Sequence, residues 1–277
     1  MSEGQKIPVF VISLARAPER RSAICKHLTD LGIEYRLIDA VDGKAMEVSQ
    51  ISELLAPGKE MHPGAVGCYL SHINVYEILR DENIEVALIL EDDARLDPRA
   101  RSLLLNGCDY LDWDYCFLDC DDHNEQGPVF YDLDSGRILG AGFTAYSLSS
   151  GPQTLHAYLI TRSAVMNRLP HAFPLERPID LYDHLPYPIR FYSLVSPKGA
   201  WVSEYSLNSF TSVKSGSLDD LSFALFRRWP IFYRLRDLLR LKDFKRNRLV
   251  KGLQAEGKLP VGPRWSALPS GREVLIT

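Results

Sequence analysis

The sequence predicts an α/β protein with one large domain and a basic helical tail. Short apolar runs alternate with helical patterns over the first hundred residues, as in βα units. The length of 277 residues suits one large domain or two small ones. After about Leu218 the pattern changes to short amphipathic helices that are rich in arginine. We therefore expect a domain over residues 1–217 and a helical tail over residues 218–277.

The first elements are expected to form a mainly parallel sheet. Pro18 suits the first turn of a helix, and Gly32 suits its end. The continuous apolar run before Pro18 is typical of a strand that is buried on both faces. In chain order, the predicted elements are strand 8–14, helix 18–31, strand 35–38, helix 64–80 and strand 86–90.

Weaker patterns continue the domain. Further strands are predicted at 115–118 and 158–160, and the second leads into a helix near Ser163. Asp134-Ser-Gly136 is typical of a hairpin turn. A proline-rich loop surrounds Ile179–Asp183.

The charge is unevenly distributed along the chain. Residues 1–226 contain 19 Lys and Arg against 32 Asp and Glu, whereas residues 227–258 contain 11 against 3. An acidic body disfavours nucleic acid as a partner for most of the chain. The five cysteines are few and scattered, and the first residues lack a basic-then-apolar signal pattern. A reduced, cytoplasmic protein is expected.

Glu91-Asp-Asp93 follows an apolar strand directly, and ligands of open α/β sheets bind beyond the carboxyl ends of strands. Three adjacent acids repel one another unless a cation or hydrogen-bond donors neutralise them. Hard divalent cations prefer carboxylates together with phosphate oxygens. These residues therefore indicate either a metal–diphosphate site or a solvated acidic turn that caps the next helix.

Two other segments carry groups that suit a ligand site. Arg16, Arg20 and Arg21 follow the first strand, and guanidinium groups match phosphate geometry, although such arginines are often solvated on a helix face. Ser71 and His72 lie on the helix that opens with two glycines, and burial inside a helix–sheet contact would also explain them. No Walker loop, nucleophile elbow or zincin motif is present.

Taken in order, these motifs resemble glycosyltransferase family 25, which contains bacterial lipooligosaccharide galactosyltransferases and procollagen galactosyltransferases. The family commonly has Gly-Glu-Ile-Gly-Cys where this chain has Gly64-Ala-Val-Gly-Cys68. The stretches that carry the resemblance are Val9–Leu14 with Arg16, Arg20 and Arg21, Ala40–Gly43, Gly64–His72, Ala87–Asp93, His156–Ile160 and Pro178–Asp180.

The resemblance implies a GT-A (Rossmann-like) fold, a UDP-sugar donor, usually UDP-galactose, a Mn²⁺ or Mg²⁺ cofactor and inversion at the anomeric carbon. It places Asp93 on the metal and implies that Asp180 is the general base, with Asp183 in reserve because a spacing of three would share a helix face. The residues expected to bind the nucleotide sugar are Ser13, Leu14, Arg16, Arg20, Arg21, Asp42, Gly67, Ser71, His72, Glu91 and Asp92.

The leading hypothesis is a metal-dependent galactosyltransferase that extends a lipooligosaccharide, lipopolysaccharide or related cell-envelope glycan. A metal-dependent phosphohydrolase would also use clustered acids and arginines, but the seven histidines form no recognisable ligand cluster in the sequence. A catalytically inactive module that binds nucleotide sugars is the third hypothesis. The expected partners are a UDP-sugar donor and a glycan or glycolipid acceptor.

The tail suggests a further partner. Its apolar residues recur at spacings of three and four, and its arginines occupy the remaining positions, as in helices that lie on anionic membranes. We expect peripheral association with the cytoplasmic face of the inner membrane, or packing of the apolar stripe on the core. The apolar residues are Phe223, Phe226, Trp229, Phe232, Leu235, Leu238 and Leu239.

Overall fold

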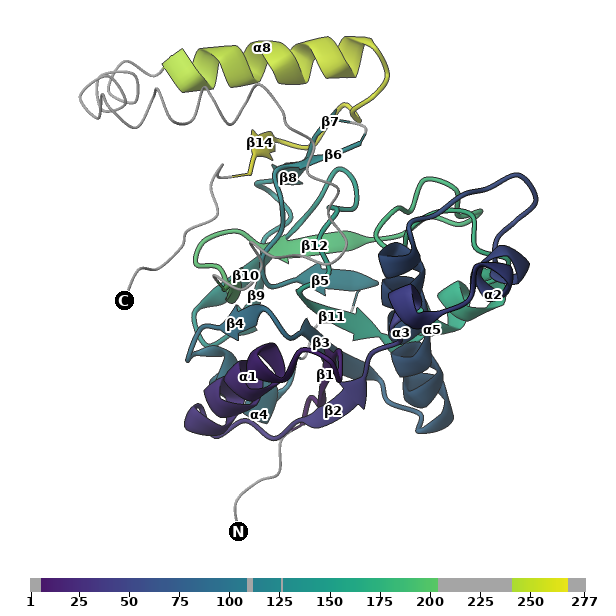
Figure 1. The fold of residues 1–277 in the computed structure, drawn as a ribbon. Helices are drawn as coiled ribbons and strands as arrows, with labels where there is room; N and C mark the ends of the chain where they lie inside the picture. The colour runs from purple at the N-terminus through teal and green to yellow at the C-terminus, as the bar shows by residue number, and fades with distance from the viewer. Residues whose placement is uncertain (1–5, 109–111, 126, 204–240, 269–277) are drawn as a thin grey trace, which may run out of the picture.

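A computed structural model describes residues 6–108, 112–125, 127–203 and 241–268 of the chain. An eight-stranded sheet lies at its centre, in the order β2-β1-β3-β11-β5-β12-β10-β9 (Figure 1). In that order the strands are β2 (Arg36–Asp39), β1 (Val9–Ser13), β3 (Val86–Glu91), β11 (Ala157–Thr161), β5 (Tyr115–Phe117), β12 (Phe191–Leu194), β10 (Phe143–Ser147) and β9 (Arg137–Gly140).

The sheet is mixed, so the prediction of a mainly parallel sheet is confirmed for the first strands and wrong for the sheet as a whole. β2, β1 and β3 run parallel, as the βα pattern predicts. β11 then lies antiparallel between β3 and β5, and β10 is antiparallel to both of its neighbours. A strand that is buried on both faces is apolar throughout, whether it runs parallel or antiparallel to its neighbours. Composition alone therefore does not reveal the direction of β11.

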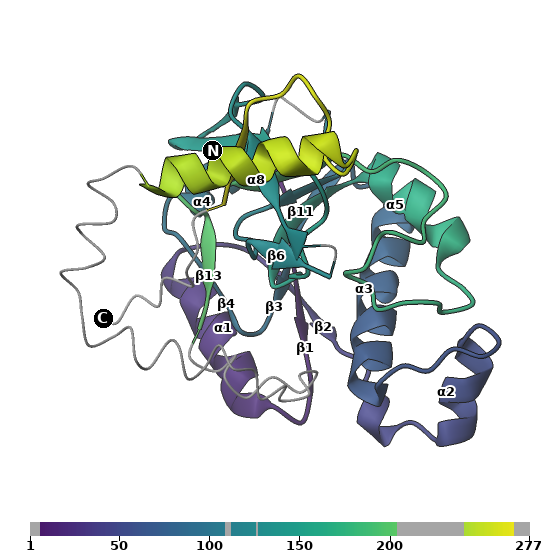
Figure 2. The same cartoon turned by 90° about the horizontal axis from the view of Figure 1, so that it is seen from above.

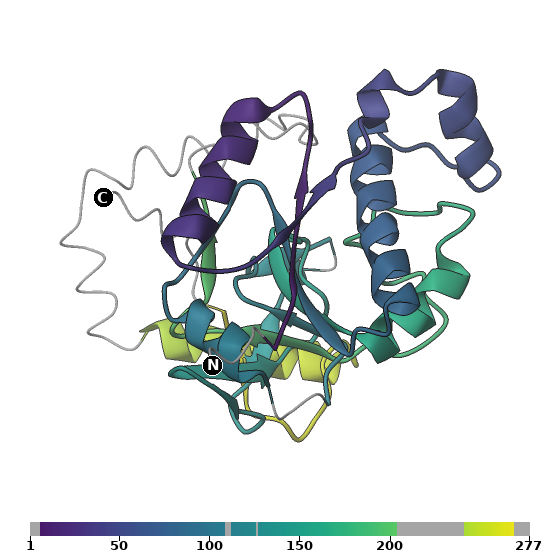
Figure 3. The ribbon, with the colours of Figure 1, turned by 90° about the horizontal axis from the view of Figure 1, so that it is seen from below.

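Helices cover both faces of the sheet (Figures 2 and 3). α1 (Pro18–Asp30) and α4 (Ala100–Asn106) share one hydrophobic cluster with the sheet residues Val9 and Val11. α3 (Pro63–Asp81) and α5 (Arg162–Arg168) share the other cluster with Phe10 and Ile12. Successive side chains of a strand point to opposite faces, so one apolar run supplies both cores.

The remaining elements of the described chain lie outside the central sheet. Asp134–Gly136 is not the turn of a hairpin, because the strand before it pairs with β14 and the strand after it pairs with β10. The elements outside the central sheet and its covering helices are η1 (Gly43–Ala45), α2 (Val48–Leu54), β4 (Ala94–Leu96), β6 (His123–Asn124), β7 (Gly127–Pro128), β8 (Phe130–Asp132), η2 (Leu169–His171), β13 (Ala200–Val202), α8 (Leu241–Ala255) and β14 (Trp265–Ala267).

Part of the expected tail joins the body of the molecule. β14 pairs antiparallel with β8, and Figure 1 shows α8 beside this strand pair. The amphipathic stripe predicted between residues 219 and 240 lies outside the described residues. Within the described ranges, no helix combines the length and the apolar character that a membrane span requires.

Candidate active site

A cavity of about 710 Å³ lies where β1 and β3 end. Its wall also includes the first turns of α3, residues 153–156 before β11, and residues 178–181 after η2. Ligand cavities in proteins are usually about 300–1,000 Å³, so this one has the size of a small-molecule site. The position matches the rule that α/β sheets bind ligands beyond the carboxyl ends of parallel strands.

The structure brings most of the sequence-predicted site residues to this cavity. Those that line it are Leu14, Arg16, Arg20, Asp42, Ser71, His72, Glu91, Asp92, Asp93 and Asp180. Four others do not line it, namely Ser13, Arg21, Gly67 and Asp183.

Ser13 and Arg21 lie behind the wall. The buried Ser13 hydroxyl donates a hydrogen bond to Asp92 Oδ2 at 2.8 Å. The Arg21 guanidinium donates to the Ser13 carbonyl oxygen at 2.8 Å and pairs with Asp39 at 2.5 Å. Both residues therefore hold the end of β1 in place without facing the cavity.

Gly67 allows the loop after β2 to pack directly on α3. A Cβ atom at Gly67 would lie 2.5 Å from the Val41 carbonyl oxygen, closer than real contacts allow. Ser71 Oγ accepts a hydrogen bond from the Val41 N–H at 2.9 Å. This packing holds Asp42 at the rim, where its carboxylate pairs with Arg16.

Asp180 and Asp183 do not share a helix face, so that prediction is wrong. Residues 178–183 form turns, with the Leu181 N–H bonded to the Pro178 carbonyl oxygen. Pro186 and Pro188 follow this segment closely, and each disfavours a helical backbone at the residue before it. Asp180 consequently faces the main cavity, whereas Asp183 lines a smaller cavity beside it.

The adjacent carboxylates of Asp92 and Asp93 have different surroundings. Both oxygens of Asp92 are engaged, one by Ser13 and the other by Arg20 Nη2 at 2.5 Å. Asp93 Oδ2 lies 3.2 Å from the same Arg20 nitrogen. Asp93 Oδ1 is buried and has no hydrogen-bond partner among the described residues. The structure thus anchors Asp92 and leaves one oxygen of Asp93 available.

The environment of Asp93 fits a divalent cation. Burial and the charge of Glu91 raise the pKa of the Asp93 carboxyl to about 6. A cation beside this oxygen would offset both the burial of the carboxylate and its repulsion from Glu91. Mn²⁺ and Mg²⁺ prefer oxygen ligands. Asp93 would hold the metal, and bound diphosphate oxygens would complete its ligand set.

A second group of ligand atoms lines the same cavity. The ligand atoms of Cys68, His72 and Glu91 all lie within 4.8 Å of one another, and His72 Nε2 is 3.3 Å from Glu91 Oε1. Burial and the charge of Glu91 raise the pKa of the Cys68 thiol well above its usual range. A protonated thiol is a poor ligand for a hard cation, so this trio fits Mn²⁺ less well than Asp93 does.

The sequence motifs did not single out the residues on β11's side of the cavity. His156, Thr154 and Asp121 line the cavity, and the Thr154 hydroxyl is buried without a hydrogen-bond partner among the described residues. Burial acts to lower the pKa of His156, but the Asp119 carboxylate, whose Oδ2 lies 3.5 Å from His156 Nε2, raises it overall. His156 opens the weak His-Ala-Tyr-Leu-Ile stretch, which was the available signal for this wall.

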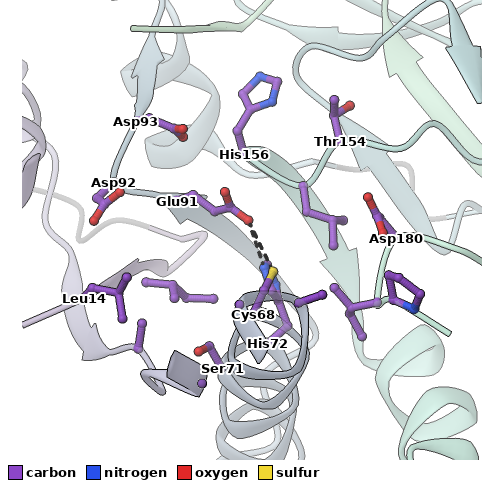
Figure 4. A pocket seen from close by; sticks show the side chains of 18 of the residues that line it. Leu14, Cys68, Ser71, His72, Glu91, Asp92, Asp93, Thr154, His156 and Asp180 are labelled. Carbon is purple, nitrogen blue, oxygen red and sulfur yellow. Dashed lines mark hydrogen bonds and ion pairs between the residues drawn. The ribbon is translucent and has the colours of Figure 1, made fainter. Parts of the chain in front are cut away.

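Asp180 lies across the cavity from Asp92 and Asp93, with Glu91 between them (Figure 4). Burial raises the pKa of the Asp180 carboxyl above its usual value. The arrangement places the Asp93 oxygen and the Arg20 guanidinium on one side, and the half-buried carboxylate of Asp180, which can accept a proton, on the other. The first side can stabilise negative charge, and the second can accept a proton.

Comparison with known proteins identifies the family. The profile of glycosyltransferase family 25 (LPS biosynthesis protein) matches residues 6–182. The chain therefore belongs to glycosyltransferase family 25. It is 34% identical over 125 residues to procollagen galactosyltransferase 1-A of Xenopus laevis, covering 40% of this chain and 20% of that protein. It is 31% identical over 193 residues to the human inactive glycosyltransferase 25 family member 3, covering 64% of this chain and 31% of that protein.

The chain thus spans about a fifth to a third of the length of these relatives. A crystal structure of a glycosyltransferase involved in the glycosylation of the major capsid of PBCV-1 shares 8% sequence identity, with a TM-score of 0.31. The match covers 58% of this chain and 62% of the other chain. Its TM-score is too low to add to the family assignment.

Proposed function

We propose that this protein is a metal-dependent, inverting galactosyltransferase of the GT-A type. UDP-galactose would be the donor, and a lipooligosaccharide, lipopolysaccharide or related cell-envelope glycan would be the acceptor. The observation that carries the proposal is the opposition of Asp93 and Asp180 across one cavity. Membership of the family and its similarity to proteins named galactosyltransferases support the choice of donor sugar.

The donor diphosphate would bind on the side of β1 and β3. Arg20 and Arg16 supply positive charge at this wall, and Asp93 offers the oxygen for Mn²⁺ or Mg²⁺. When bound, the cation supplies Lewis-acid stabilisation of the negative charge on the leaving diphosphate. Arg20, held by Asp92 and Asp93, adds a fixed guanidinium near the same charge.

Inversion requires a single displacement. The acceptor hydroxyl oxygen forms a bond to the anomeric carbon while the bond from that carbon to the UDP oxygen breaks. The bonding electron pair leaves with UDP, and the hydroxyl proton passes to Asp180. The raised pKa of Asp180 makes its carboxylate a stronger base than an exposed aspartate.

A panel of UDP-sugars with Mn²⁺ tests the proposal on the full chain. Slow, Mn²⁺-dependent hydrolysis of UDP-galactose, faster than that of UDP-glucose or UDP-N-acetylhexosamines, is expected. Discrimination between such hexoses rests on a few polar contacts worth about 1–3 kcal/mol. Cleavage of generic phosphoesters instead would favour a phosphohydrolase and contradict the proposal.

A second candidate follows from the comparisons. Three of the relatives are named inactive or probable inactive members of the family, which supports a module that binds UDP-sugars without turnover as the alternative function. The same panel separates the two, because UDP binding by calorimetry without hydrolysis of any UDP-sugar would favour the binding module.

A further inference from the structure

A smaller cavity of about 160 Å³ adjoins the main one. Asp180, Leu181, Glu125 and Gln153 line both cavities, so the two meet beside the proposed base. A hydroxyl group that donates its proton to Asp180 could therefore belong to a molecule seated in the smaller cavity. The other residues that line the smaller cavity are Asn124, Ser150, Gly151, Tyr182, Asp183, Tyr187, Ile189 and Phe191.

One wall of the smaller cavity is aromatic and tightly packed. The rings of Tyr182 and Phe191 meet edge to face, with centroids 4.7 Å apart. A Cβ atom at Gly151 would lie 2.5 Å from the Tyr182 ring and 2.8 Å from the Phe191 ring. The backbone of Gly151 thus packs directly on both rings and leaves them no room to shift toward it.

Polar groups line the rest of the smaller cavity. The Asn124 side-chain amide donates to Ser150 Oγ and to the Gly151 carbonyl oxygen, each at 2.9 Å. Apolar ring faces beside fixed polar groups suit a sugar ring, which has C–H faces and a rim of hydroxyl groups. The small volume suits one sugar ring better than an oligosaccharide.

The charge of this cavity is negative. Asp180, Glu125 and Asp183 contribute carboxylates to its wall, and no lysine or arginine from the described part of the chain lines it. Arg177 lies outside the lining, 2.5 Å from Glu125 and 3.8 Å from Asp183, and compensates part of this charge. A carboxylate or phosphate on the bound ring would meet like charges that are only partly neutralised.

We propose that the smaller cavity is the acceptor subsite and that it takes an uncharged sugar ring. This rests on the proposed function, since it places the reacting hydroxyl next to Asp180. The subsite discriminates against rings that carry a carboxylate or a phosphate. The bond changes are those of the displacement described above, with the proton delivered to Asp180 from this side.

Saturation-transfer NMR on the full chain with UDP and Mn²⁺ tests the subsite directly. The probes are methyl glycosides of galactose, glucose, mannose and N-acetylglucosamine, together with the matching uronates and 6-phosphates. At least one neutral glycoside should bind, and its charged partners should bind more weakly. Ser150→Trp, which fills the cavity, should remove the signal, whereas Ser52→Trp on the exposed face of α2 should not.

A milder variant guards against misfolding of the tryptophan variant. Asp183→Asn removes one carboxylate from the lining, so the preference for neutral over charged glycosides should fall about two- to fivefold. Stronger binding of uronates or phosphates than of neutral glycosides overturns the proposal. The proposal is also overturned if no glycoside binds while UDP still binds, or if the neutral glycosides still bind to Ser150→Trp. Loss of UDP binding by the wild-type chain would instead contradict the proposed function.

Discussion

At the scale of single residues, the contrast between Asp92 and Asp93 matters most. The two acids are expected to have different roles. Both oxygens of Asp92 are engaged, whereas Asp93 has a buried oxygen without a hydrogen-bond partner in the described ranges. The first holds Arg20 and the end of β1 together. The second is the oxygen that a cation would use.

We expect Asp93→Asn to abolish transfer and to weaken Mn²⁺-dependent UDP binding while the fold survives. The substitution removes a carboxylate that burial and Glu91 already destabilise. Calorimetric titration with UDP, with and without Mn²⁺, and thermal unfolding would measure the two effects. Near-wild-type transfer would show that Asp93 does not bind the metal.

Asp92→Asn is the matched comparison, and it should lower stability. It weakens the buried hydrogen bonds with Ser13 and Arg20, which we expect to cost about 1–3 kcal/mol of unfolding free energy. Urea unfolding of the two variants would measure the difference. Equal stability of both variants would argue against separate roles for the two acids.

Asp180 leads to a pH prediction. A general base must be deprotonated, so kcat falls as the pH falls through its pKa. Because burial raises that pKa, the acid limb of the kcat profile should lie above the usual range for aspartate. Asp180→Asn should lower kcat by about 10²–10⁴ and leave the donor KM nearly unchanged.

Steady-state rates between pH 4 and 8 at saturating donor would measure this limb. Asp183→Asn should keep the acid limb, because its side chain faces the smaller cavity. Loss of UDP binding in Asp180→Asn would instead place Asp180 on the donor side.

At the scale of elements, the junction of η1 with α3 sets the geometry of one wall. Two glycines meet there, since a Cβ atom at Gly67 would lie 2.6 Å from the Gly43 nitrogen. The sequence shows Gly64 and Gly67 at the start of the helix, but it does not show which backbone Gly67 approaches. The partner loop comes from after β2 and is revealed only by the tertiary contact.

We expect Gly67→Ala to destabilise the protein by about 1–3 kcal/mol, because the methyl group would overlap the Val41 carbonyl oxygen. Gly252→Ala in α8 is the control, since nothing lies within 4 Å of its Cβ position. It should stabilise by about 0.5–1 kcal/mol through helix propensity. Denaturant unfolding would measure both, and an unchanged stability of Gly67→Ala would contradict the close packing.

The sequence predicted the elements better than their arrangement. The expected strands and helices up to residue 91 all form, because apolar runs mark the strands and residues such as Pro18 and Gly32 mark where a helix begins or ends. The direction of β11 and the partners of β8 and β9 could not be predicted, since they depend on long-range pairing. Of the predicted site residues that line the cavity, Leu14, Arg16, Arg20 and Glu91–Asp93 were found from strand ends, whereas Asp42, Ser71, His72 and Asp180 came from the family resemblance. His156 and Thr154 were missed.

At the scale of the whole molecule, β14 changes how the tail should be tested. Removing everything after residue 217 would also remove the partner strand of β8. Loss of function in such a truncation would therefore mix two causes. Substitution of charges in the full chain separates them.

We expect the full chain to co-sediment with anionic vesicles at low salt and to dissociate at high salt. The 11 basic residues of segment 227–258 outnumber its 3 acids, and each basic residue near an anionic surface contributes about 1 kcal/mol. Replacing Arg227, Arg228, Arg234 and Arg236 with Gln should lower vesicle affinity by about 10² or more. If the wild-type chain ignores anionic vesicles at low salt, the membrane hypothesis fails.

The reversed strand in the middle of the sheet also bears on how the protein is made. During synthesis β3 leaves the ribosome long before β11, although the two are neighbours in the finished sheet. Until residue 161 emerges, one edge of an apolar strand stays without its partner and can pair with another chain. A nascent or prematurely terminated product that stops before β11 is therefore prone to aggregate, even though it contains the whole first βαβ unit. The early half of this protein depends on the late half for its solubility.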